Sequence, residues 1–276
     1  MLIDKRWPSI QQPGFASCIL AFSLGATVWA QMLYPINPSN TEALWIGKKI
    51  WQNECHGSIT GLTSWNEGEN FASLGIGHFI WYPKGVRGPF EESFPKFLNF
   101  AAEKHTSLPP WLVNTQACPW NSRPEFLRAQ NSGQMNELRR FLAHTVHLQA
   151  EFMIVRLQNS LSKMLQEAAP SGRANVEEQF ARLASTSNGR YALVDYVNFK
   201  GEGVLPTERY HDQGWGLLQV LEEMHGTGNG ASAEREFSRS ATAVLTRRVQ
   251  NSPPGRKESR WLPGWINRVK GYSGNS

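Results

Sequence analysis

Three glutamates near the front of the chain, Glu54, Glu67 and Glu69, have the spacing of a paired-carboxylate site. Breaking a glycosidic bond requires one carboxyl group that donates a proton to the leaving oxygen. It also requires a second group that attacks or stabilises the positive sugar ring. The donor must keep its proton near neutral pH, and apolar surroundings favour that protonated form. Ile50 and Trp51 lie one turn before Glu54 and supply such surface, so Glu54 is the candidate general acid.

The elements expected around these residues would bring the carboxylates together. Apolar residues at helical spacing predict a helix over residues 41–54, which Glu54 ends. Residues 55–83 are rich in Gly, Ser, Thr and Asn and include an alternating apolar run, which predicts a small antiparallel hairpin or three-stranded sheet. A sheet folded against the end of the helix would bring Glu67 and Glu69 towards Glu54.

A helix that ends in Glu54, an acidic hairpin and the run Ser-Leu-Gly-Ile-Gly-His over residues 73–78 together resemble the active-site segment of phage-type lysozymes. The resemblance implies a lysozyme-like fold with Glu54 as general acid. It places Glu67 where those enzymes have an Asp and Ser73 where they have a Thr. Both would then hold and activate water, and hydrolysis would proceed with inversion. His78 would support the cleft.

The chain also departs from that family. The gap before Glu67 is longer than usual, the second acid is Glu rather than Asp, and the hydroxyl is Ser rather than Thr. Glu69 remains an alternative second acid. The aromatic rings of Trp65 and Tyr82 could stack on sugar faces. With Glu69 and His78, they are the candidate substrate-binding residues.

Two downstream segments carry a weaker form of the same resemblance. Residues 192–201 are similar to a buried helix of the family, and residues 252–265 are similar to its arginine-rich C-terminal helix and turn. Residues from about 90 to 190 match no part of it and are expected to be a helical insertion (about 90–190). We therefore predict a predominantly helical α+β fold, with a signal peptide over residues 1–30 and one lysozyme-like domain over residues 31–276.

The remaining helices follow from apolar periodicity and from helix start and stop residues. They are expected over 91–104, 134–169 (as one or two helices), 175–185, 191–199, 215–224, 233–250 and 261–270. Residues 107–133 are expected to be irregular, Gly189 to end a helix, and residues 271–276 to be frayed.

The N-terminus has the pattern of an export signal. Lys5 and Arg6 precede an apolar run over residues 15–26, and small residues at Val28 and Ala30 offer a cleavage site. The run is short for a bilayer span. The pattern predicts a periplasmic or secreted protein with no stable membrane insertion after cleavage.

Charge and cysteine content add weaker constraints. The whole chain carries +5 at neutral pH, which suits an anionic polymer. The charges are scattered, and the resemblance favours a polysaccharide, peptidoglycan above all, over nucleic acid. Outside the signal, Cys55 and Cys118 could form a disulfide in an oxidising compartment or remain buried thiols.

Glu202 offers a competing site. Gly-Glu-Gly at residues 201–203, followed by Gly-Trp-Gly-Leu-Leu-Gln-Val at 214–220, is similar to the signature of soluble lytic transglycosylases. Such enzymes use a single acid, and the sugar's own hydroxyl closes an anhydro ring. Glu202 would then be the catalyst, with the alternatives that it lines the far wall of the same cleft or merely ends a helix.

Two further alternatives lead away from hydrolysis. His144, His147 and Glu151 share one helix face and could hold a metal, but they lack a further ligand in a recognisable motif, so we expect no metal site. The large helical segment and the altered spacing also suit a non-catalytic module that binds cell wall or a partner. Phosphate-binding loops, Cys-x-x-Cys pairs and Gly-x-Ser-x-Gly elbows are absent from the sequence, and no cofactor is expected.

Overall fold

The computed structural model describes residues 36–88 and 90–274, and its first helix is α2 (Asn40–Cys55), close to the predicted bounds. The Ser39 side chain accepts a hydrogen bond from the backbone NH of Glu42 (3.2 Å) and so caps the helix. After Cys55 the chain leaves the helix through His56, which has a φ of 51°. Glu54 is the penultimate residue of this helix and lies just before the segment that leads into the sheet.

The sheet is the predicted three-stranded antiparallel one. It consists, in chain order and in spatial order, of β1 (Thr63–Ser64), β2 (Ala72–Leu74) and β3 (Phe79–Trp81). In the central strand, Ser73 pairs with Ser64 on one side and with Ile80 on the other. Residues 65–71 form the turn between β1 and β2, and the Gly-Ile-Gly-His motif forms the turn between β2 and β3.

Helices form most of the remaining chain, which confirms the mostly helical α+β class. The first group is α3 (Phe94–Glu103), α4 (Pro110–Val113), α5 (Arg123–Arg128), α6 (Gly133–His144) and α7 (Val146–Glu167). The second group is α8 (Arg173–Ala184), α9 (Ser187–Lys200), α10 (Leu217–Glu222), α11 (Ala231–Asn251) and α12 (Leu262–Lys270). A short hairpin, β4 (Arg209–Tyr210) with β5 (Gln213–Gly214), lies between α9 and α10.

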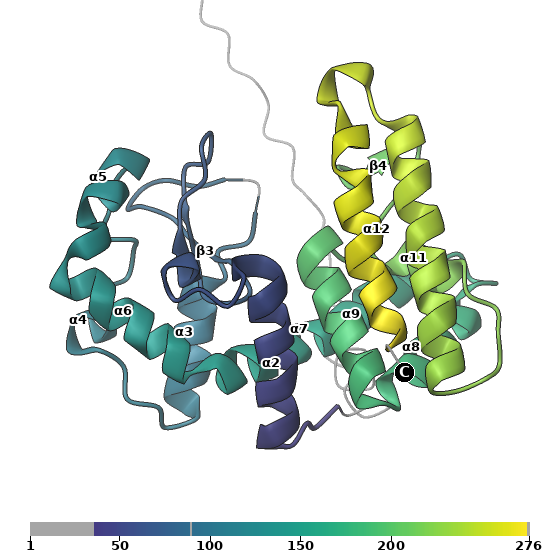
Figure 1. Cartoon of the computed structure of the whole chain (residues 1–276), viewed down its shortest axis with the longest axis horizontal. Coiled ribbons are helices and arrows are strands. Elements are labelled where there is room, and N and C mark those ends of the chain that lie inside the picture. The colour runs from purple at the N-terminus through teal and green to yellow at the C-terminus, as the bar shows by residue number, and fades with distance from the viewer. Residues whose placement is uncertain (1–35, 89, 275–276) are drawn as a thin grey trace, which may run out of the picture.

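Figure 1 shows these elements in two lobes, with α2 and α7 between them. The N-terminal lobe contains the sheet and α3 to α6, and the C-terminal lobe contains α8 to α12. Helix α2 packs along α7, and Gly47 permits their close approach. A Cβ at Gly47 would lie 2.8 Å from the carbonyl oxygen of Val146. One hydrophobic core extends through both lobes.

The segment expected as an insertion, residues 90–190, contains α3 to α8 and the start of α9. Its longest helix, α7, packs against α2, α3 and α9. Leu157 and Leu161 of α7 are buried in the common core. The segment therefore includes the helix that joins the two lobes, and it is not an appended unit.

Several expected boundaries were wrong. Residues 107–133 are irregular only in part, because they also form α4, α5 and a short 3-10 helix (Ala129–Asn131). Prolines stand in the first turns of α4 and α5, where a missing backbone NH costs nothing. Gly189 does not end a helix. It lies in the first turn of α9, where its NH donates to the Thr186 side chain (2.9 Å). Helix α3 begins at Phe94, three residues later than predicted, with proline in its first turn.

The C-terminal residues were expected to be frayed, and those that the structure describes are not. Tyr272 is fully buried, and its ring contacts the rings of Tyr191 and Phe237. The aromatic side chain therefore anchors the end of the chain to α9 and α11.

The predicted signal peptide, residues 1–30, lies outside the described residues. Among the helices that are described, none has the length and apolar character needed to span a bilayer. Cys55 and Cys118 are both buried and both free, which decides between the two alternatives for these thiols.

Candidate active site

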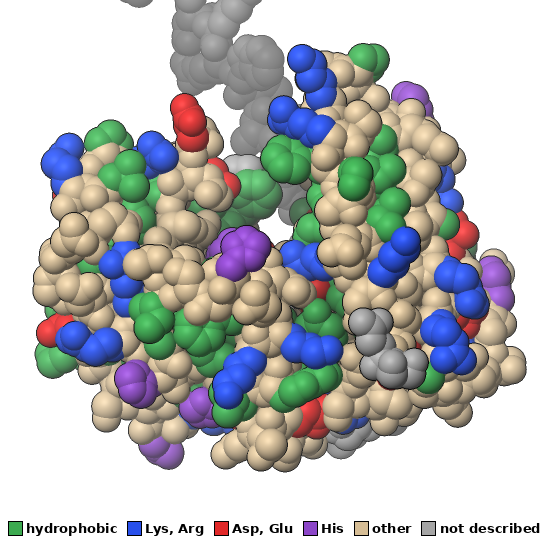
Figure 2. All heavy atoms as spheres, in the orientation of Figure 1, with side chains coloured by type: hydrophobic (Ala, Val, Ile, Leu, Met, Phe, Trp, Pro, Cys, Tyr) green, Lys and Arg blue, Asp and Glu red, His purple; other side chains and the backbone are tan. Residues whose placement is uncertain are grey.

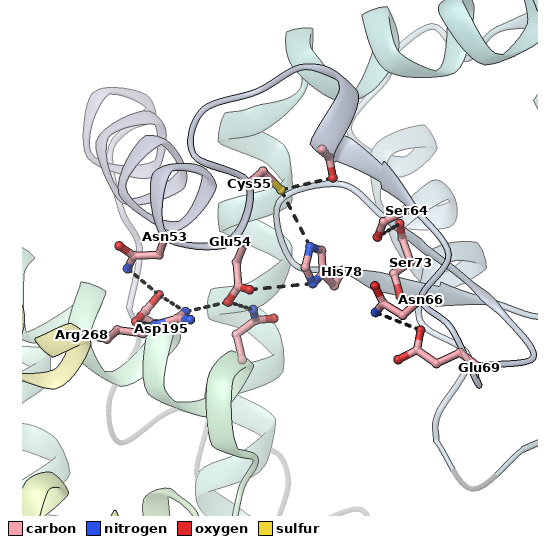
Figure 3. Close-up of polar contacts among 12 residues, drawn as sticks. Asn53, Glu54, Cys55, Ser64, Asn66, Glu69, Ser73, His78, Asp195 and Arg268 are labelled. Carbon is pink, nitrogen blue, oxygen red and sulfur yellow. Dashed lines mark hydrogen bonds and ion pairs between the residues drawn. The ribbon is translucent and has the colours of Figure 1, made fainter. Parts of the chain in front are cut away.

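Glu54 lies between the two lobes, with only 14% of its side chain exposed. Its two carboxylate oxygens have different surroundings (Figure 3). Oε1 accepts hydrogen bonds from Arg268 Nη2 (2.6 Å) and from Asn198 Nδ2 (3.2 Å). Oε2 is 3.8 Å from His78 Nδ1, beyond hydrogen-bond range, and no described residue donates to it. One oxygen is thus fixed by the protein, and the other is open to a reacting group.

Arg268 is held in place by Asp195, a fully buried carboxylate on α9. Nε of Arg268 donates to Asp195 Oδ2 (2.8 Å) and Nη2 donates to Oδ1 (2.7 Å), a bidentate pair. Asn53 and the hydroxyl of Tyr272 also donate to Asp195. Burial works against the guanidinium charge, but Asp195 and Glu54 outweigh it and raise the pKa of Arg268 above its usual value. The site therefore keeps a fixed positive charge against Oε1.

His78, the last residue of the Gly-Ile-Gly-His turn, approaches Glu54 from the N-terminal lobe (Figure 3). The turn is fixed to α7, because the NH of Ile76 donates to Gln149 Oε1 (2.8 Å). Gly75 has a φ of 71°, and a Cβ there would collide with the same Gln149 side chain. His78 itself has a φ of 48°, and its Nε2 lies 3.8 Å from Cys55 Sγ. Glycine is thus needed for the turn that brings His78 to Glu54.

A cavity of about 250 Å³ lies beside these groups. His78 and Ile80 line it from the sheet side, Met153 and Arg156 from α7, and Asn198 from α9. His78 and Asn198 are both neighbours of Glu54. Figure 2 shows the molecular surface indented between the two lobes. Glu54 does not itself line this cavity, which lies next to the carboxylate through these two neighbours.

The other predicted catalytic residues, Ser73 and Glu67, lie in the sheet and in one of its turns, and neither lines this cavity. Ser73 is buried in the central strand, and its carbonyl accepts a hydrogen bond from Ser64 Oγ (3.3 Å). Glu67 is exposed in the turn between β1 and β2, and no hydrogen bond or ion pair within the described residues joins it to Glu54. Glu69, in the same turn, accepts a hydrogen bond from Asn66 Nδ2 (3.1 Å). Glu54 and His78 are thus brought together, whereas neither Glu67 nor Glu69 makes a polar contact with them.

The two aromatic residues predicted to bind substrate are packed into the N-terminal lobe. Trp65 is 5% exposed, its Nε1 donates to the carbonyl of Glu69 (2.8 Å), and its ring lies against Phe126. Tyr82 is also 5% exposed, and its ring packs edge-on against Phe71. Neither ring presents a free face to a sugar. Their positions indicate that they hold the turn and the end of the sheet, which corrects the predicted role.

Glu202 lies apart from Glu54, in a second cavity of about 490 Å³. Lys163 Nζ contacts both of its carboxylate oxygens (3.1 and 3.2 Å), and Ser160 Oγ donates to Oε1. The two cavities share the lining residues Glu91 and Arg156. Glu202 therefore lines a cavity that adjoins the one beside Glu54.

Two of the three residues considered for a metal are engaged elsewhere. Glu151 pairs with Lys104 (3.0 Å), and His144 Nδ1 lies 2.7 Å from the carbonyl oxygen of Arg140. Among the residues that the structure describes, no group of three His, Cys, Asp or Glu side chains is arranged to hold an ion.

The sequence did not predict that Arg268, Asp195 and Asn198 join the site. A signal was present for Asp195, since a lone carboxylate inside the apolar run of α9 requires a buried partner. Arg268 lies 214 positions after Glu54, and its pairing depends on how α12 packs.

The geometry can support proton donation from one carboxyl oxygen while a fixed cation stabilises the other.

Searches of protein-family models, of curated proteins and of solved structures find no match to this chain.

Proposed function

We propose that this protein is a glycan-cleaving hydrolase of lysozyme-like fold, acting on peptidoglycan or a related amino-sugar polymer, with Glu54 as general acid. One observation carries the proposal. Glu54 is a nearly buried carboxylate between two lobes, with Oε1 bound by Arg268 and Asn198 and with Oε2 free of any donor among the described residues. A side chain held in this way can carry a proton on Oε2 and present it to a leaving oxygen.

The guanidinium of Arg268 stabilises Glu54 after the proton has left. When Oε2 gives up its proton, Glu54 becomes a carboxylate, and Arg268 already lies 2.6 Å from Oε1 to stabilise it. Charge that develops in a transition state is stabilised most when its partner is already in position, because no reorganisation is then required. Asp195 holds Arg268 in place throughout, since it is fully buried and binds the guanidinium through two oxygens.

The water-activating groups are Ser73 and Glu67 in this proposal. Ser73 lies in the central strand of the sheet, and Glu67 lies in the turn that leads to it. An inverting reaction needs space for a water molecule between the second carboxylate and the sugar, so the two carboxylates need not touch each other. No cofactor takes part. The protein would act in the periplasm or outside the cell, after removal of residues 1–30.

The exposed position of Glu67 favours a second candidate function. An exposed carboxylate that does not line the cavity beside Glu54 suits a scaffold that binds cell wall without cleaving it. The two candidates differ in a measurable way, because only the hydrolase releases new reducing ends.

The test is release of reducing ends from purified peptidoglycan by the wild type, Glu54→Gln and Glu178→Gln. The first change is nearly isosteric at the candidate acid, and the second alters an exposed carboxylate on α8. We expect Glu54→Gln to lower the rate by a factor on the order of 10²–10⁴, which is typical of losing a general acid, and Glu178→Gln to keep it. Full activity in Glu54→Gln would reject the proposal. Binding without release by the wild type would favour the non-catalytic module.

A further inference from the structure

The second cavity continues the cleft beside Glu54 along helix α7. Its volume is about 490 Å³, and it shares Glu91 and Arg156 with the cleft. Arg156, Lys163 and Gln166 line it from α7, at positions that share one face of a helix. A polymer bound in the cleft would therefore reach the second cavity by passing Arg156.

The charges that line the second cavity are unequal. Lys96, Arg156 and Lys163 supply three positive charges, and Glu91 and Glu202 supply two negative ones. Burial of Glu91 works against its charged form, but the three cations more than compensate and lower its pKa. The cavity therefore has an excess of positive charge and favours an anion.

Arg156 is the cation with the most unused bonding capacity. Lys163 binds both oxygens of Glu202, and Lys96 binds Glu91. The guanidinium of Arg156 makes no hydrogen bond within the described residues, and its ion pair with Glu91 is long, at 3.6 Å. It is 40% exposed and lies at the junction of the two cavities. A guanidinium presents five donors in a planar fork that matches a carboxylate.

Ser162 gives an independent sign of a missing ligand. Its side chain is nine-tenths buried and lines the second cavity. Its hydroxyl has no hydrogen-bond partner within the described part of the chain. A buried polar atom without a partner costs about 1–3 kcal/mol, so such atoms are uncommon in folded proteins.

We propose that the second cavity is a subsite for a carboxylate carried by the glycan, with Arg156 as its anchor and the Ser162 hydroxyl as a neutral hydrogen-bonding group. The inference rests on the proposed glycan-cleaving function and names a chemical class for part of the substrate. The carboxylate could belong to an acidic sugar of the polymer or to a peptide branch attached to it, since both supply the same group.

The subsite is tested by measuring binding rather than cleavage. All proteins carry the Glu54→Gln change, which leaves the polymer intact. The ligands are soluble peptidoglycan fragments, the same fragments with their carboxylates amidated, fragments stripped of peptide branches, and neutral chitin oligosaccharides. The variants add Arg156→Gln, Ser162→Ala, or Arg239→Gln, which changes an exposed arginine on α11 that lines neither cavity. Calorimetry gives the dissociation constants.

We expect the acidic fragments to bind roughly tenfold more tightly than the amidated ones, the worth of one charge-assisted hydrogen-bonded contact. Arg156→Gln should remove this preference without changing the affinity for chitin oligosaccharides. Ser162→Ala should weaken binding of the acidic fragments several-fold while leaving thermal stability equal or higher. Arg239→Gln should change nothing. Retained preference in fragments without peptide branches would assign the carboxylate to the sugar, and its loss would assign it to the branch.

Two results would overturn the subsite, and they differ in what they say about the proposed function. Binding of glycans without preference for carboxylates, or an equal loss for every ligand in Arg156→Gln, would reject the subsite alone. Failure of every glycan to bind would reject the subsite and the proposed function together.

Discussion

Arg268 donates a 2.6 Å hydrogen bond to Glu54, and the two side chains are 13% and 14% exposed. Arg268 also binds the fully buried Asp195 through two nitrogens. Helix α2, at the front of the chain, is thereby joined to α12, near its end. The pairing makes the candidate site a product of the whole fold and not of one local motif.

Replacing Arg268 by methionine should destabilise the protein strongly. The change leaves the Asp195 carboxylate buried without its cation, and breaking a buried pair in this way costs about 3–5 kcal/mol. Urea unfolding of Arg268→Met beside Arg239→Met measures the difference. Replacing the exposed Arg239 should change the free energy of unfolding by less than about 0.5 kcal/mol. Equal stability in the two variants would show that Asp195 does not depend on Arg268.

Tyr272→Phe removes a single hydroxyl from the same network. The hydroxyl donates to Asp195 Oδ2 in the core, so the expected loss is about 1.5–3 kcal/mol, the range for a hydrogen bond to a charged group. The aromatic packing against Tyr191 and Phe237 should remain. In an Asp195→Asn background the same change should cost less, because the acceptor is no longer charged. Equal losses in both backgrounds would contradict the assigned contact.

The burial of Lys200 predicts that the stability of the protein depends on pH. Its Nζ lies 3.3 Å from the centroid of the Trp265 ring and 3.9 Å from that of Phe199. Burial lowers the pKa of Lys200 to about 6, and the neighbouring arginines act in the same direction. Between that value and the usual lysine value of 10.5, the unfolded chain binds the extra proton. The free energy of unfolding therefore rises with pH in this window.

The comparison of wild type with Lys200→Met isolates that effect. Between about pH 7 and about pH 9, the stability of the wild type relative to the variant should rise by up to about 1.4 kcal/mol per pH unit. Lys270→Met, at an exposed position on α12, is the matched control. Denaturant midpoints at several pH values measure the slope. A flat difference between wild type and Lys200→Met would exclude a neutral Lys200 in the folded protein.

The two buried thiols should be unreactive in the folded protein. Burial raises the pKa of Cys55 to about 11 and that of Cys118 to about 12. At about pH 8 the reactive thiolate is then scarce, so alkylation by iodoacetamide should be at least about tenfold slower than in the unfolded chain. Mass spectrometry of the alkylated peptides follows each cysteine separately. A disulfide-linked peptide containing both residues would contradict the free-thiol structure.

The sequence predicted the local part of the site and missed the long-range part. Helix periodicity and the alternating apolar run within residues 55–83 correctly indicated α2 and the sheet, because both patterns depend on neighbouring residues. Burial of Trp65 and Tyr82 was not predictable, since an aromatic residue suits a core and a sugar-binding face equally. The contact of Glu54 with Arg268 depends on the packing of α12 against α9 and α11, which no local pattern encodes.

Some predicted helix boundaries were wrong for a related reason. Prolines in residues 107–133 were taken as interruptions, although proline is also a preferred residue in the first turn of a helix. Residues 271–276 were expected to fray as the last residues of the chain. Tyr272 is nevertheless fixed there by a buried carboxylate that is 77 positions away in the chain.

In the proposed reaction, Glu54 cleaves a glycan by general acid catalysis. The most direct test is mass spectrometry of the products released from purified peptidoglycan by the mature wild type, Glu54→Gln and Glu202→Gln. We predict reducing-end fragments from the wild type and from Glu202→Gln, and none from Glu54→Gln. Anhydro-ended fragments that persist in Glu54→Gln and vanish in Glu202→Gln would rule out Glu54 as the general acid and assign the reaction to Glu202 instead.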